Sequence, residues 1–288
     1  MAVSTQYPLT TREDRAQARR RRKRRHIAIA AVSTIIILGG LVARILTASG
    51  WPNVRRSFFS AYWFRKAFGS VLSGFWTDVR MFLIIEVCVL ALGLLIALIR
   101  TFPVPALYPV RLLATVFVDV MRGIPTILLI FLIGFSVPAL NLSGVPTSAT
   151  VLGGIALAMN YSAYVSEVFR AGLMSVHPSQ GAAGLALGLT PAQTLRHVIV
   201  PQAVGRVVPP LLNDFIALQK DVALVSTLGV FEAFRAAQIV ADQNFNYTPL
   251  LAAAALYLCV TIPMTRFVDH LQWRTIRERG PALALGPR

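Results

Sequence analysis

Apolar runs of about 20 residues, separated by short polar stretches, repeat along the whole chain. A helix needs ~20 such residues to cross the hydrocarbon core of a bilayer. Six runs meet this length and predict transmembrane helices at about 27–46, 81–99, 112–135, 150–169, 204–225 and 250–267. At this length in lipid only a helix satisfies its own backbone hydrogen bonds. The predicted fold is therefore all-α, a polytopic membrane helical bundle.

The composition supports a membrane protein. Of 288 residues, 56% are hydrophobic and only 14% are charged, and the mean hydropathy is +0.64. Soluble domains carry about 25% charged residues. Both cysteines, Cys88 and Cys259, fall inside predicted spans, so we expect them to fill the core rather than form a disulfide or a metal site.

The formal net charge of +16 raises the alternative of nucleic-acid binding. Nine basic residues lie between Arg12 and Arg25, directly before the first predicted span. In that position basic residues hold a helix end on the cytoplasmic side, and they can contact anionic lipid headgroups. The placement favours a topology anchor over a nucleic-acid arm, so no nucleic acid is expected as a partner. Six spans then put both termini in the cytoplasm.

The pattern also divides the chain into segments. The expected division is a basic cytoplasmic extension at 1–26, an extra transmembrane helix at 27–48, an external or interfacial segment at 49–80, the main transmembrane domain at 81–270, and a cytoplasmic tail at 271–288.

The external segment is an exception to the charge rule, because it mixes basic and aromatic residues in "VRRSFFSAYWFRKAF". Such a mixture is typical of an interfacial amphipathic helix.

Between the fourth and fifth predicted spans lies a polar stretch, "QGAAGLALGLTPAQTLRHVIVPQA". Pro178 suits the first turn of a helix, and Gly188 suits the left-handed residue just past its end. Thr190 and Gln193 form a capping-box pattern that opens a second helix, which is expected to stop near Pro201. The stretch predicts a helix, a glycine hinge and a helix, exposed to the cytosol and able to fit a groove on a soluble partner.

These residues resemble the EAA loop of ABC importer permeases, written EAA, three residues, G, nine residues, then I-x-L-P. The matching positions here are Ala182, Ala183, Gly184, Gly188, Val198, Val200 and Pro201, and the spacing from Gly188 to Pro201 is reproduced in full. The flanking "SEVFRAGL", "VPPLLNDFI" and "KDVAL" are similar to the polar amino-acid branch of that family. The resemblance covers roughly residues 70 to 275.

The resemblance implies a permease domain at 81–270, in a bacterial-type plasma membrane, with a cytoplasmic coupling loop at 176–201. It implies a cytoplasmic ATPase dimer that holds ATP and Mg²⁺, a second permease, an extracytoplasmic solute-binding protein and a polar amino-acid substrate. No cofactor is expected on this chain. The implied ATPase-coupling residues are Ala182, Ala183, Gly184, Gly188, Thr190, Pro191, Val198, Val200 and Pro201. Ala182 departs from the family pattern, which has a glutamate there, so one polar contact to the ATPase is in doubt.

Polar residues inside the predicted spans are candidates for a translocation path or gate, because such residues face a bundle interior or an aqueous pathway. They are Glu86, Arg122, Asn213, Asp214, Lys220 and Asp221. For the last two, capping of the span at the outer interface is the favoured alternative. For Arg122, beside Gly123 and Pro125, a packing kink is favoured over a gate.

Other features bear on coupling and on competing classes of protein. Glu167 and Arg170 are spaced for an ion pair within one helix, which would support the loop that follows. No hydrolase or Walker A motif is present, which argues against an enzyme and requires another chain to supply a nucleotide site. A self-sufficient, gradient-driven carrier or channel remains an alternative, although no inverted repeat is evident. So does a membrane-anchored scaffold, against which the polar residues of the fifth span argue.

Overall fold

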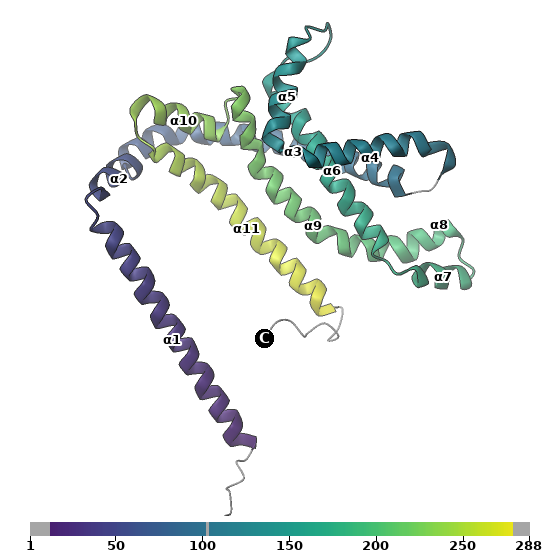
Figure 1. Cartoon of the computed structure of the whole chain (residues 1–288), viewed down its shortest axis with the longest axis horizontal. Helices are drawn as coiled ribbons and strands as arrows, with labels where there is room; N and C mark the ends of the chain where they lie inside the picture. Colours follow the sequence, from purple (N-terminus) through teal and green to yellow (C-terminus); the bar gives the residue numbers. More distant parts are fainter. Residues whose placement is uncertain (1–11, 102–103, 279–288) are drawn as a thin grey trace, which may run out of the picture. The chain divides into compact units, whose positions relative to one another are not determined.

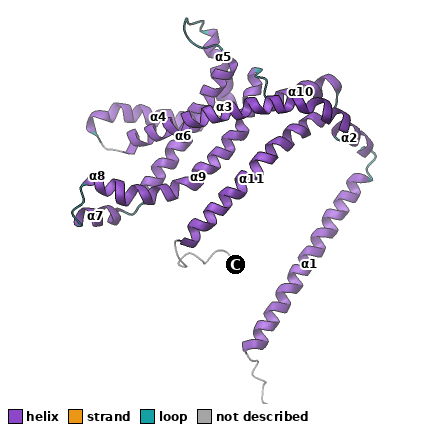
Figure 2. Ribbon diagram, turned by 180° about the vertical axis from the view of Figure 1, so that it is seen from behind, coloured by secondary structure: helices purple, strands orange, loops and turns teal. Residues whose placement is uncertain are grey.

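The structure, a computed structural model, describes the backbone of residues 12–101 and 104–278 and the side chains of residues 25–101 and 104–273. Its elements in these ranges are helices and turns, without a β-strand, so the predicted all-α fold is confirmed (Figures 1 and 2). The chain separates into two compact units, 1–59 and 60–288.

The first unit contains α1 (Arg12–Leu46) and α2 (Trp51–Phe58). Between Arg25 and Leu46, a window of 18 residues has a mean hydropathy of 2.3, and the side chains are exposed on all sides, as expected of a helix that faces lipid. Helix α1 starts inside the basic run at Arg12, so this run and the first predicted span share one helix. Residues 1–11 of the predicted extension lie outside the described residues.

Helix α3 (Ala61–Thr101) begins the second unit and is 41 residues long. It passes through residue 80, where the sequence placed a boundary, because its sequence contains no proline and the next one is Pro103. Its length of about 60 Å is twice the ~30 Å of hydrocarbon, so its first half extends beyond the predicted span. Basic and aromatic side chains pair there, with Lys66 Nζ 4.7 Å from the ring centroid of Trp63.

The predicted interfacial helix is therefore not a single helix. Helix α2 ends at Phe58 in the first unit, and α3 begins at Ala61 in the second.

The third predicted span is broken rather than straight. Helix α4 (Tyr108–Gly123) follows the short η1 (Pro105–Leu107). Between α4 and α5 (Thr126–Ala139) the chain bends by 109°. Ile124 is extended between them, as expected of a residue that precedes a proline. The sequence predicted a kink here, and the observed bend is much sharper.

Helix α6 (Ala149–Met174) is the centre of the second unit and packs against α3, α4, α5 and α9. It is the fourth predicted span, and its 26 residues reach about 39 Å. Its polar residues Asn160, Ser162 and Ser166 are all buried inside the bundle. Apolar side chains of α3, α4, α5, α6 and α9 form the larger core around it.

The remaining helices complete the bundle. They are α7 (Pro178–Ala186), α8 (Pro191–Thr194), the π-helical turn η2 (Leu195–Ile199), α9 (Val200–Asp221), the 3₁₀ helix η3 (Val222–Leu228), α10 (Ala233–Asn244) and α11 (Thr248–Glu278). The run from α8 to η3 bends by 50° into α10. Within the second unit, α7 and α8 lie at the end opposite α5 and α10 (Figure 1).

By length and composition, three described helices can cross a membrane, and the count rises to five if each bent pair is one span. The three are the apolar part of α1, α3 with the residues before it, and α11. The polar helix α6 is not among them, although it is long enough. The second and sixth predicted spans thus lie in α3 and α11, and the fifth lies in α9 and η3.

A buried carboxylate cluster joins α3, α10 and α11 near the middle of α3. Asp78 accepts hydrogen bonds from the Tyr257 hydroxyl at 2.7 Å and from the Ala233 amide at 3.3 Å. Glu232 caps α10 by accepting from the amide of Phe234 at 2.7 Å. Asp78 and Glu232 are 1% and 0% exposed, so the cluster holds three helices together out of contact with solvent.

The contact between α3 and α10 generates the first prediction. A Cβ atom added at Gly74 would lie 2.5 Å from the carbonyl carbon of Glu232, and backbone cannot move aside easily. We expect Gly74→Ala to lower the free energy of unfolding by about 1–3 kcal/mol through overpacking. The thermal unfolding of the detergent-solubilised protein measures this.

Gly69, on the same helix, is the matched control. No described atom lies within 4 Å of a Cβ added there, so Gly69→Ala is expected to be neutral or slightly stabilising. Equal melting temperatures for the two variants would contradict the close approach of α3 and α10.

Candidate functional site

The stretch between α6 and α9 forms a compact knob, here called the coupling segment (176–201). Its first helix, α7, has Pro178 in its first turn, as predicted. Gly188 has φ +82°, and its amide donates to the carbonyl of Leu185 at 3.0 Å. The amide of Leu189 donates to the carbonyl of Gly184 at 3.2 Å. These two bonds make a Schellman motif, so the predicted glycine hinge is confirmed.

The second helix opens with the predicted capping box. The Gln193 amide donates to the Thr190 hydroxyl oxygen at 3.3 Å, and the Thr190 amide donates to the Gln193 side-chain oxygen at 2.9 Å. Both ends of the hinge therefore satisfy their backbone groups locally.

The prediction that this helix stops near Pro201 is wrong. The helix passes through a π-helical turn, in which the Val200 amide donates to the carbonyl of Leu195, and continues as α9. Proline lacks an amide and would clash with the carbonyl four residues earlier in a regular helix. The wider turn relieves that conflict, as π-bulges do. The second helix of the coupling segment is thus continuous with α9.

Side-chain contacts hold the coupling segment to the ends of α6 and α9. Gly184 packs on Thr194, whose Cγ2 would be 2.8 Å from an added Cβ. Arg206 of α9 donates to the backbone carbonyl of Ser175, which caps the end of α6, and to its hydroxyl oxygen at 2.9 Å. A guanidinium at this position satisfies carbonyls that a helix C-terminus leaves free. The Arg206 contact therefore joins the end of α6 to α9, on either side of the coupling segment.

The predicted coupling residues surround one exposed surface. Ala182, Ala183, Gly188, Thr190, Pro191, Val200 and Pro201 are exposed, Val198 is half-buried and Gly184 is buried. Leu187, which the sequence analysis did not single out, is 83% exposed at the hinge. Most of the apolar surface of this side chain is therefore available for burial against another protein.

The predicted path residues separate into two groups. Glu86 of α3 and Asp214 of α9 are half-buried, and their carboxylates are close enough for their negative charges to repel each other. Asp221 is half-buried and accepts a hydrogen bond of 2.8 Å from Tyr161 of α6, which also interacts with Asp214. The structure therefore brings carboxylates from α3 and α9 together with a tyrosine hydroxyl inside the bundle.

The other predicted path residues lie at the surface of the chain. Asn213 and Lys220 are exposed, and so is Arg122, whose guanidinium stacks 5.5 Å from the ring centroid of Tyr164. Lys220 is exposed, as a residue at the outer interface would be, whereas Asp221 is half-buried and hydrogen-bonded to Tyr161 of α6.

Sequence reasoning missed Asn160 and Tyr161. Asn160 donates to the Met121 carbonyl at 2.7 Å and accepts from the Thr126 hydroxyl at 3.1 Å, so it supports the break between α4 and α5. The signal was available, because polar residues in the middle of a predicted span normally have partners inside a bundle.

The predicted ion pair of Glu167 with Arg170 is confirmed, with Arg170 Nη2 2.7 Å from Glu167 Oε2. The other carboxylate oxygen accepts from Arg100, at the end of α3.

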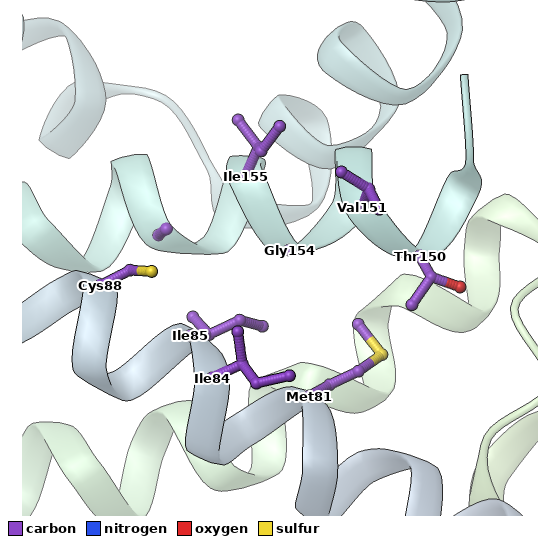
Figure 3. A pocket seen from close by; sticks show the side chains of 9 residues that line it. Met81, Ile84, Ile85, Cys88, Thr150, Val151, Gly154 and Ile155 are labelled. Carbon is purple, nitrogen blue, oxygen red and sulfur yellow. The ribbon is translucent and has the colours of Figure 1, made fainter. Parts of the chain in front are cut away.

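A groove with a volume of about 260 Å³ lies between α3 and α6, as Figure 3 shows from close by. Its lining is nearly all apolar, so it does not fit a polar solute: Met81, Ile84, Ile85, Cys88, Thr150, Val151, Gly154, Ile155 and Ala158. Cys88 and Cys259 are both exposed, so the expectation that they fill the core is wrong. Within the described residues, no group of three or more His, Cys, Asp and Glu side chains suits a metal ion.

The fold and the knob define a class, the multi-pass membrane permeases that couple to a soluble partner through a loop between two core helices. Residues 90–277, more than half of the chain, match the model for the binding-protein-dependent transport system inner membrane component, and the chain belongs to this family. It is a permease subunit of an ABC importer, and membership implies an ATPase and a binding protein as partners. The gradient-driven alternative receives no support.

Similar proteins agree with this family. A probable amino-acid ABC transporter permease of Sinorhizobium fredii is 39% identical over 54% of this chain and 68% of its own length. The L-cystine transport system permease of Bacillus subtilis is 33% identical over 74% and 84%. The glutamine transport system permease of Escherichia coli is 36% identical over 64% and 83%.

Solved structures show the same fold. An amino acid ABC transporter crystallised with histidines is 31% identical with a TM-score of 0.65, covering 72% of this chain and 94% of that one. The inward-facing MetNI methionine ABC transporter has a TM-score of 0.53 at 19% identity and supports the fold alone.

The hinge generates the second prediction. No described atom lies within 4 Å of a Cβ added at Gly188, so a substitution there costs backbone strain rather than a clash. We expect Gly188→Val to destabilise the coupling segment by about 1–2 kcal/mol and to speed tryptic cleavage after the exposed Arg196 by about 5- to 30-fold.

Asparagine tolerates the left-handed conformation, so Gly188→Asn is expected to change the cleavage rate much less. Cleavage after Arg266 of α11 serves as an internal control and should stay constant. Equal rates for the two variants would show that the left-handed hinge does not control the segment.

Proposed function

We propose that this permease forms part of the translocation path of an ATP-driven importer for a polar amino acid, and that the coupling segment docks onto the partner ATPase. The observation that carries the proposal is the exposed knob with Leu187 at its tip, 83% exposed, and Leu185 beside it, 51% exposed. Burial of exposed apolar side chains against a partner removes them from water and contributes favourably to association.

The attachment of the knob supports a coupling role. Since the second helix of the coupling segment continues into α9, and Arg206 of α9 binds Ser175 at the end of α6, a force applied at the knob tilts both helices. Closure of the ATPase around ATP and Mg²⁺, both held by that partner, supplies the force. This chain has no nucleotide site of its own in the proposal.

The arrangement of polar groups supports a polar substrate. Glu86, Asp214 and Asp221 place carboxylates from α3 and α9 near the interior of the bundle, where an ammonium group finds favourable electrostatic contacts. Relatives are named for glutamine and cystine. We take a glutamate-like, glutamine-like or basic amino acid as the substrate, which binds as its ammonium group passes these carboxylates.

The remaining partners follow from this scheme. A second permease, the same chain or a sister subunit, completes the path, and an extracytoplasmic solute-binding protein delivers the substrate to the face opposite the knob. The basic run before Arg25 holds the amino terminus in the cytoplasm, next to anionic lipid, and the carboxyl terminus lies on the same side.

Docking through Leu187 generates the third prediction. In mild detergent, the tagged chain is expected to co-purify with a soluble ATPase from its native cells, identified by mass spectrometry. Leu187→Asp should lower the amount of bound ATPase at least about tenfold, because it replaces an apolar anchor with a charge.

Leu142 is the matched control, since it is a leucine 56% exposed in the loop after α5, far from the knob. Leu142→Asp should leave the bound ATPase unchanged. Loss of ATPase in both variants, or in neither, would rule out docking through the tip of the knob.

Transport itself is the fourth prediction. Proteoliposomes that contain the purified complex and its binding protein, with ATP on the ATPase side, should take up at least one of labelled L-glutamine, L-glutamate, L-arginine and L-cystine. No ion gradient is needed, because ATP supplies the energy. Uptake that follows an imposed ion gradient in the absence of ATP would instead identify a secondary carrier.

A further inference from the structure

Three charged side chains join the end of α3 to the helix that leads into the coupling segment. Glu167 of α6 uses one carboxylate oxygen to accept from Arg100 and the other to accept from Arg170, whose Nη2 and Nε lie at 2.7 and 3.1 Å. Arg100 is in the last turn of α3. It makes the connection between helices, because Arg170 lies on the same helix as Glu167.

The pair of Arg100 and Glu167 is well shielded from solvent. Their side chains are 11% and 19% exposed, whereas the pair of Arg266 and Asp269 on α11 is 80% and 48% exposed. Charged hydrogen bonds that are shielded from water are stronger and better ordered than surface ion pairs. The Arg100 contact is therefore able to hold α3 and α6 in register.

The contact between Arg100 and Glu167 is one of two polar contacts that join α3, α6 and α9 at the same end of the bundle. Arg100 links α3 to α6, and Arg206 links the end of α6, at Ser175, to α9. The coupling segment lies between α6 and α9 in the chain, so a displacement of the knob reaches Glu167 and then Arg100.

Helix α3 reaches the other end of the bundle without interruption. Its residue Asp78 meets the Ala233 amide and the Tyr257 hydroxyl, and Gly74 packs against the backbone of Glu232. A shift of α3 along or about its axis is thus passed to α10 and α11. Polar contacts to other helices therefore hold α3 near its middle, at Asp78, and at its C-terminal end, at Arg100, and an unbroken helix connects the two points.

We infer that Arg100 is a positioning residue that transmits the movement of the coupling segment to α3, and through α3 to α10 and α11. The inference rests on the proposed function, because it requires an ATPase that moves the knob. It predicts that loss of Arg100 uncouples ATP hydrolysis from transport without preventing the ATPase from docking.

Removal of Arg100 is a clean test because Glu167 keeps its second partner. In Arg100→Gln, the carboxylate still accepts from Arg170, so no charge is left buried and unpaired, and the protein is expected to fold. Arg100→Lys retains a cation that reaches Glu167. Arg266→Gln on α11 removes an exposed pair of the same spacing type as Glu167 and Arg170 and serves as the control.

The experiment uses the permease purified with its ATPase and binding protein and reconstituted in proteoliposomes. It measures the ATP hydrolysed per molecule of labelled L-glutamine, L-glutamate, L-arginine or L-cystine taken up, together with the amount of bound ATPase and the melting temperature. Arg100→Gln should raise this ratio about 2- to 30-fold, the range found for residues that carry coupling, with the bound ATPase unchanged. Arg100→Lys and Arg266→Gln should stay near the wild-type ratio.

A charge exchange gives a second, independent readout. Arg100→Glu places two carboxylates opposite each other and should uncouple strongly, whereas Arg100→Glu combined with Glu167→Arg restores an ion pair between α3 and α6 and should recover coupling. Recovery in the double variant supports transmission through this contact.

Two results overturn the inference in distinguishable ways. If the wild-type complex is coupled and Arg100→Gln keeps its ratio, with or without a lower melting temperature, Arg100 has only a structural role and the proposed function still stands. If the wild type brings down no ATPase and takes up none of the four amino acids with ATP, the proposed function fails and this inference fails with it.

Discussion

The requirement that every backbone amide and carbonyl find a partner inside a bilayer governs the architecture of the second unit. Where α4 ends and α5 begins, the side chain of Asn160 takes the carbonyl of Met121. Where η3 gives way to α10, the carboxylate of Glu232 takes the first amides of the new helix. At both of these bends a buried polar side chain satisfies the backbone, and each of the two links the bend to a neighbouring helix.

The same requirement explains why α6 and α3 differ in character from the other helices. Helix α6 supplies partners to its neighbours through Asn160 and Tyr161, so it is polar, central and largely buried. Helix α3 contains no proline and has no break, so it runs the length of the unit. Its polar residues Asp78, near the middle of the helix, and Arg100, in its last turn, contact other helices. A bundle built in this way has one supporting helix and one connecting helix, and the bent helices surround them.

Local sequence predicted much of this molecule and could not predict the rest. The apolar runs located the membrane helices, and Gly188, Thr190 and Gln193 gave the hinge and the cap of the coupling segment, because those features involve residues within a few positions of one another. The partners of the breaks are far apart in sequence: Asn160 and Met121 are 39 residues apart, and Tyr257 and Asp78 are 179 apart. Pro201 predicts the end of a helix, but a π-helical turn accommodates it and the helix continues. The sequence does not reveal this turn, because it depends on backbone geometry rather than residue type.

The self-contained build of the coupling segment also accounts for the substitution at position 182. Its hinge, its cap and its attachments to α6 and α9 are made by residues of the segment and of those two helices, so no partner protein is needed to keep its shape. Ala182 is exposed on the surface of α7 and takes part in none of these contacts. A carboxylate there would add at most an exposed ion pair to a partner, which contributes about 0.2–1 kcal/mol. The hinge, the cap and the exposed leucine of the knob are all formed without a carboxylate at position 182, so the loss of that carboxylate leaves the proposed docking surface in place.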